Sequence, residues 1–176
     1  MEIAPLSPLN AVFVVVFVGL VVCAAASDLR SLEIPNWLSV ALVLIFLPAA
    51  LAADISFTAI AIEYGVSIGI FAMGAMLFGF GLIGGGDVKF MAAMALWLHW
   101  SVLGTLFVYV ALLGGVLAGI ILLITKIQAL LFVKKLIPWM NGDDAEPQSI
   151  PYGVAISGAG LIVLSQAQWA PFSLFG

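Results

Sequence analysis

Two aspartates are the residues whose type and position could do chemistry in this sequence. Asp87 closes a run of three glycines, Gly84, Gly85 and Gly86, set between strongly apolar segments. An acidic side chain at such a boundary is costly unless it has a partner or a function. Glycines there let the backbone leave helical geometry and let another backbone come close. Asp28, which follows the first apolar run, is the acid that we expect to work with Asp87.

Paired aspartates suit the hydrolysis of a peptide bond. One carboxylate takes a proton from a water molecule while the other acid polarises the scissile carbonyl. This chemistry needs neither a metal ion nor a covalent nucleophile, so we expect no cofactor. Because like charges repel, two adjacent carboxylates share a proton. The glycine run could bind an extended peptide through backbone hydrogen bonds.

The ends of the expected helices predict which acid holds the shared proton. Asp87 would open a helix, and the partial positive charge at a helix N-terminus favours the ionised carboxylate. Asp28 would close a helix, where the partial negative charge disfavours ionisation. The sequence therefore predicts that Asp28 holds the proton and that Asp87 is the anion.

Other interpretations of these residues stay open from the sequence. Asp87 could be only the N-cap of the helix that follows it, and Asp28 could pair with Arg30 in a loop. The two acids could instead carry protons or cations in a transporter, since intramembrane acids often form such pathways. Lys89 could either orient the acids or anchor its helix at the membrane surface.

The elements that must position these acids are membrane helices. The chain has 176 residues, of which 65% are hydrophobic and 8% are charged, whereas about a quarter of a soluble domain is charged. Several apolar runs are near the roughly 18 residues that indicate a transmembrane helix. We therefore expect an all-α membrane protein with one integral-membrane domain, residues 1–176, embedded in a lipid bilayer. The single Cys23 and the single His99 form no ligand cluster, so we expect no metal site. We also expect no nucleic-acid partner.

A bundle of six transmembrane helices accounts for the apolar pattern. The expected spans cover residues 9–26, 37–53, 64–82, 88–97, 101–125 and 152–168. The fourth span is short, residues 54–63 would be a connection, and residues 128–139 resemble an interfacial amphipathic helix. The glycine pairs Gly65/Gly69 and Gly115/Gly119 predict close contact between helices.

The positions of the cations predict the orientation of the bundle, because cytoplasmic loops are enriched in lysine and arginine. With six spans and an external N-terminus, all five cations face the cytoplasm. They are Arg30, Lys89, Lys126, Lys134 and Lys135. Both termini are then periplasmic, and Asp28 and Asp87 lie at the same cytoplasmic edge. The tryptophans are expected at the two interfaces, with Trp97 and Trp100 on the outer side.

Three motifs follow one another along the chain. They are Asp28-Leu29-Arg30 with Ile34-Pro35-Asn36, then Gly84-Gly85-Gly86-Asp87-Val88-Lys89, then Pro151-Tyr152-Gly153. In this order they resemble the type IV prepilin peptidases, which are bacterial members of the GxGD membrane aspartyl proteases. The resemblance implies that Asp28 and Asp87 are catalytic, and that Gly84 and Gly86 are the glycines of the GxGD motif.

The resemblance also implies the activity of an aspartic endopeptidase, which removes the basic leader of a prepilin or pseudopilin at the cytoplasmic face of the bacterial inner membrane. Larger members carry an N-terminal segment with paired cysteines and also methylate the pilin, whereas this chain is similar to the compact form associated with tight-adherence (Flp-type) pili. Glu33 could attract the basic leader. The alternatives are a proton- or cation-coupled transporter, a non-catalytic pilus assembly protein, and a related intramembrane protease with other substrates.

Overall fold

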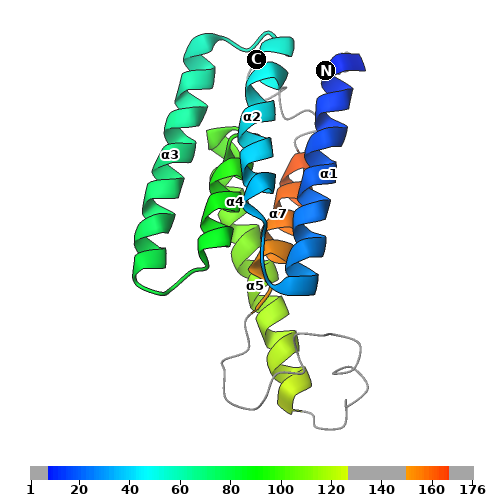
Figure 1. The fold of residues 1–176 in the computed structure, drawn as a ribbon, viewed down its shortest axis with the longest axis vertical. Coiled ribbons are helices and arrows are strands. Elements are labelled where there is room, and N and C mark those ends of the chain that lie inside the picture. Colours follow the sequence, from blue (N-terminus) through cyan, green and yellow to red (C-terminus); the bar gives the residue numbers. More distant parts are fainter. Residues whose placement is uncertain (1–7, 127–149, 167–176) are drawn as a thin grey trace.

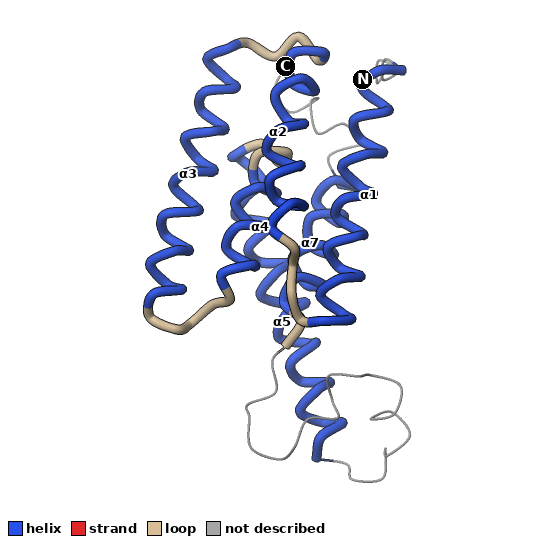
Figure 2. Tube along the Cα trace, viewed as in Figure 1, coloured by secondary structure: helices blue, strands red, loops and turns tan. Residues whose placement is uncertain are grey.

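The computed structural model describes residues 8–126 and 150–166, and all regular structure in these ranges is helical (Figures 1 and 2). The elements are α1 (Pro8–Ser31), α2 (Asn36–Ala52), α3 (Phe57–Gly79), α4 (Gly85–Ala95), a short 3₁₀ helix η1 (Trp100–Val102), α5 (Leu103–Lys126) and α7 (Tyr152–Gln166). This confirms the all-α fold for the described residues. The predicted interfacial helix, residues 128–139, lies outside them.

Three stretches are long and apolar enough to cross a membrane: Pro8–Ser31, Phe57–Gly79 and Trp100–Leu123. α2 and α7 are apolar but shorter. α4 has only 11 residues, which span about 16 Å at the rise of an α-helix. The six spans and the orientation of the termini therefore remain predictions.

The two short helices α4 and α7 lie between the longer ones (Figure 1). α4 packs on α2, α3 and α7, and α7 packs on α1, α4 and α5. The end of α1 and the starts of α4 and α7 lie at one end of the bundle, beyond which α5 extends (Figure 1). The segments that carry Asp28 and Asp87 therefore lie at the same end of the bundle, as the sequence predicted.

The first helix is longer than predicted and includes Asp28 in its last turn. Ser31 continues the turn by donating its hydroxyl to the carbonyl of Ser27, at 2.9 Å. Leu32 then adopts a left-handed conformation with φ 56°, and its N–H donates to the carbonyl of Asp28. Such a left-handed residue commonly ends a helix. Asp28 is thus fixed by helical geometry and is not part of a loop.

The predicted connection of residues 54–63 is wrong, because α3 begins at Phe57. Ser56 caps this helix by accepting the N–H of Ala59, and a serine before an apolar run is a sequence signal for a helix start. Glu63 is consequently helical and 1% exposed. Its Oε1 accepts the N–H of Trp100 at 3.4 Å and lies 3.9 Å from Nε2 of His99. The buried carboxylate ties α3 to the segment before α5.

Trp97 is a core residue and not, as predicted, part of an interfacial belt. It is fully buried, stacks on Phe17 with ring centroids 4.8 Å apart, and meets the edge of Phe46. Its indole N–H donates to the carbonyl of Leu42 at 3.1 Å. A buried tryptophan usually needs such a partner. By contrast, Trp100 is exposed, as expected of a residue at an interface.

The close contacts predicted for the two glycine pairs are absent from the described residues. Methyl groups built on Gly65, Gly69, Gly115 and Gly119 would meet nothing within 4 Å. The glycine of α3 that does permit close packing is Gly74. A methyl group there would lie 2.7 Å from Cγ1 of Val88 in α4, which is nearer than carbon atoms can approach without displacement.

We expect Gly74→Ala to lower the melting temperature in detergent, because the added methyl group must push α3 and α4 apart. Overpacking of this kind typically costs about 1–3 kcal/mol. Gly69→Ala, on the same helix, should leave the melting temperature unchanged or raise it, since alanine favours helix and the space is open. Equal effects of the two substitutions in a thermal unfolding assay would contradict the packing described.

Candidate active site

Asp28 is a buried acid that two helices hold in place. Its side chain, 3% exposed, projects from the last turn of α1. The N–H of Val154, in the first turn of α7, donates to Oδ2 at 3.2 Å. The first N–H groups of a helix have no partner four residues back within it, and this one is shared between Oδ2 of Asp28 and the carbonyl of Pro151, at 3.2 Å. The start of α7 therefore supports the ionised form of Asp28.

Gly153 allows this contact to form. A methyl group on Gly153 would lie 2.8 Å from Oδ2 and 2.9 Å from Cγ of Asp28, so any larger residue would displace the carboxylate. The sequence motif Pro151-Tyr152-Gly153 contains this glycine, but the sequence alone does not indicate that Gly153 and Val154 contact Asp28. The signal was a glycine at the start of an apolar helix, which often marks the close approach of another group.

Asp87 lies in the first turn of α4, and its carboxylate folds back over Gly84. A methyl group on Gly84 would lie 2.8 Å from Oδ2 of Asp87. Gly84 is the extended N-cap residue, whereas Gly85 and Gly86 already belong to the helix. The helix predicted to start at residue 88 therefore starts at Gly85, and only Gly84 of the run is extended.

The predicted distribution of the proton is reversed. Burial, followed by the charge of Asp28, raises the pKa of Asp87 from its ordinary value to about 6. Asp28 faces the N-terminus of α7 as well as the C-terminus of α1, and the first of these favours the anion. The dipole of the helix that contains each aspartate therefore does not by itself predict which acid is charged. Burial disfavours the charge on both acids, and at Asp28 the N–H groups at the start of α7 oppose this effect, so the proton is favoured on Asp87.

Two simpler explanations of the acids do not match the geometry. Asp87 is not the N-cap of α4, because that position belongs to Gly84. Among the described residues, Asp28 forms no ion pair with Arg30, which is exposed. Lys89 is also exposed and donates to Oδ1 of Asn36 at 2.9 Å. Its ammonium group thus joins α4 to the start of α2.

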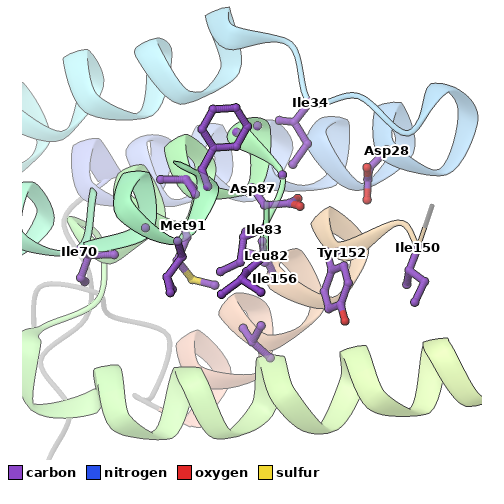
Figure 3. A pocket seen from close by; sticks show the side chains of 18 of the residues that line it. Asp28, Ile34, Ile70, Leu82, Ile83, Asp87, Met91, Ile150, Tyr152 and Ile156 are labelled. Carbon is purple, nitrogen blue, oxygen red and sulfur yellow. The ribbon is translucent and has the colours of Figure 1, made fainter. Parts of the chain in front are cut away.

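Both acids line one cavity of about 1090 Å³ (Figure 3). Asp28 and Asp87 project into it from α1 and α4, with Tyr152 of α7 nearby. Away from the acids the wall is apolar, formed by α3, α4, α5 and α7. It includes Ile70, Met73, Met91, Phe107, Val110 and Ile156. A chain segment bound here would present a polar end to the acids and an apolar end to the helices.

We expect Asp28→Asn to lower the pKa of Asp87 below about 6, because the substitution removes the like charge and leaves the burial. The measurement is a titration of ¹³C-labelled aspartate carboxyls in detergent, with the Asp87 signal identified by its loss in Asp87→Asn. Asp54→Asn, at the opposite end of α2, is the matched control and should leave the titration unchanged. An Asp87 pKa that does not respond to Asp28→Asn would show that the carboxylates are not in electrostatic contact.

Comparison with known proteins agrees with this geometry. The model of the type IV leader peptidase family matches residues 15–125, which contain both Asp28 and Asp87 but not α7. No curated protein and no solved structure matches the chain. The match covers well over half of the sequence and carries with it a peptidase activity and a membrane setting. The chain belongs to the type IV leader peptidase family.

Proposed function

We propose that this protein is an aspartic endopeptidase that uses Asp28 and Asp87 to cleave the basic leader from a type IV or Flp prepilin or pseudopilin. The observation that carries the proposal is that the two acids, 59 positions apart in a family of peptidases, line one cavity. Their different surroundings support different roles. Asp28 is the general base, and Asp87 is the general acid.

The proposed reaction follows from these roles. The carboxylate of Asp28 takes a proton from water as the water oxygen attacks the scissile carbonyl carbon. Asp87 donates its proton to the carbonyl oxygen, which gives a neutral tetrahedral diol. Asp28 then returns its proton to the departing amine while Asp87 recovers one from the diol, and the C–N bond breaks. A pKa of about 6 keeps both protonation states of Asp87 accessible near neutral pH.

The first turn of α4 supports the binding of the peptide backbone. Gly84, Gly85 and Gly86 line the cavity next to Asp87. The first N–H groups of an α-helix have no partner within it, and side-chain-free residues let an extended peptide approach. Lys89 contributes indirectly, because its hydrogen bond to Asn36 holds α4 against the start of α2. These residues thus orient the peptide and the acid.

The charge pattern supports a cytoplasmic active site. Arg30, in the last turn of α1, and Lys89, just after the first turn of α4, lie at the end of the bundle that carries the acids. Cytoplasmic ends of membrane proteins are enriched in such cations. We therefore propose six spans in the bacterial inner membrane, periplasmic termini, and one peptidase domain. Glu33, which is exposed and lines the cavity, would attract the basic leader.

The direct test is leader cleavage in cells that co-express a prepilin with the wild type, Asp28→Asn or Asp87→Asn. The wild type should trim the leader, and each variant should reduce trimming by about 10³-fold or more, because neither acid can be replaced in the proton transfers. Asp54→Asn should trim normally. Full cleavage by a folded Asp28→Asn or Asp87→Asn variant would remove that residue from the mechanism.

The apolar part of the cavity generates a separate prediction about the membrane segment of the substrate. Val110 lines the cavity from α5, whereas Leu112 is exposed on the same helix and does not. Val110→Trp should slow cleavage of a membrane-inserted prepilin about tenfold or more, since the indole fills space that the substrate needs. Cleavage of a short peptide that ends just after the scissile bond should be affected less. Leu112→Trp should change neither rate, and equal losses in both variants would contradict this use of the cavity.

A further inference from the structure

The short segment that joins α1 to α2 is held firmly at both ends. Ser27 of α1 donates its hydroxyl to the carbonyl of Glu33 at 2.8 Å. At the other end, Lys89 of α4 donates to the side chain of Asn36 at 2.9 Å. Leu32 turns the chain with its left-handed φ of 56°. The residue between these restraints, Ile34, therefore has a defined position.

Ile34 lies against one glycine in each of the two central helices. A methyl group on Gly86 of α4 would lie 3.7 Å from Cβ and from the backbone N and O of Ile34. A methyl group on Gly153 of α7 would lie 2.6 Å from its Cδ1. Ile34 itself is 8% exposed. Its main chain thus borders α4, and the tip of its side chain borders α7.

Each of these glycines is adjacent in sequence to a residue that places a carboxylate. Gly86 directly precedes Asp87, and Gly153 directly precedes Val154, whose N–H binds Asp28. Figure 3 shows Ile34 beside both acids, with its side chain directed into the space that they border. Because its main chain and Cβ border α4 while its side-chain tip borders α7, the length of this side chain affects the distance between the two elements that place the carboxylates.

We propose that Ile34 is a positioning residue that sets the separation of Asp28 and Asp87, with Gly86 and Gly153 as the surfaces on which it rests. Its role in the reaction rests on the proposed function, whereas its role in spacing the acids does not. Isoleucine suits this task because two substituents on Cβ restrict its χ1 rotation. A residue with fewer rotamers holds a distance better than a flexible one of equal volume.

The first test compares Ile34→Ala, Ile34→Val and Ile34→Leu in a detergent cleavage assay. Ile34→Ala removes the contact with Gly153 and should lower kcat about tenfold or more while KM changes less than about twofold, because orientation of the acids and not peptide binding is lost. Ile34→Val removes only Cδ1 and should cost less. Ile34→Leu keeps the volume but loses the β-branch, and its kcat should lie between those of Ile34→Ala and Ile34→Val. Ile120→Ala, at an exposed isoleucine of α5, is the control that should retain wild-type kcat.

The second test pairs a substitution with its compensating change. Gly153→Ala should abolish most activity, since its methyl group meets both Cδ1 of Ile34 and the carboxylate of Asp28. Ile34→Val vacates the position of Cδ1, so the double variant Ile34→Val/Gly153→Ala should regain part of the kcat lost in Gly153→Ala. The methyl group added at position 153 would still lie too close to the carboxylate of Asp28, so the recovery of kcat should be incomplete. A double variant no better than Gly153→Ala, together with a wild-type kcat in Ile34→Ala, would overturn the proposal.

A third readout separates the spacer role from the proposed function. The change in the Asp87 carboxyl titration caused by Asp28→Asn measures the electrostatic coupling of the two acids. This coupling should differ between the wild type and folded Ile34→Ala, while Ile120→Ala should preserve it. If the coupling changes but the wild type cleaves no prepilin, Ile34 does set the separation of the acids and the proposed substrate is wrong. If the coupling is identical in the wild type and in folded Ile34→Ala, Ile34 does not set the separation, whatever the activity.

Discussion

The arrangement of the bundle follows from the need to keep two acids inside a largely apolar structure. An isolated buried carboxylate is costly, and here each acid lies at the N-terminal end of a short central helix. Asp87 belongs to the first turn of α4, and Asp28 receives the N–H of Val154 from the first turn of α7. The two helices therefore begin at the same end of the bundle, and Gly153 lets α7 come close enough. The longer helices enclose this pair and complete the cavity.

The sequence was sufficient to identify the acids and the class of fold. Asp28 and Asp87 stand out because charged residues are rare in apolar segments, and the family match contains both. What the sequence did not reveal is contact between distant segments. The bond from Val154 to Asp28 joins residues 126 positions apart, and no local pattern encodes it. The protonation predicted from the helix that contains each acid differs from the one favoured in the structure because α7 also acts on Asp28.

The remaining differences arise because membrane sequences have weak periodicity. Trp97 was expected at an interface, but α4 ends at Ala95 and the chain turns inward, so Trp97 fills the core beside Phe17. The glycine pairs of α3 and α5 suggested packing faces, yet the close contacts are made by other glycines of these helices, Gly74 with Val88 and Gly114 with Tyr152. When nearly every residue is apolar, composition does not distinguish the face that meets protein from the face that meets lipid.

The sequence separation between Val154 and Asp28 also has a consequence for biosynthesis. Chains emerge from the ribosome N-terminus first and begin to fold as they emerge, so α1 to α5 are available before α7 exists. Until residues 151–154 arrive, the Asp28 carboxylate lacks the N–H that supports its charge, and Ile34 lacks one of the two surfaces that hold it. On the proposed mechanism, a nascent chain that ends before α7 is therefore not yet able to hydrolyse peptide bonds, and activity requires that α7 be in place.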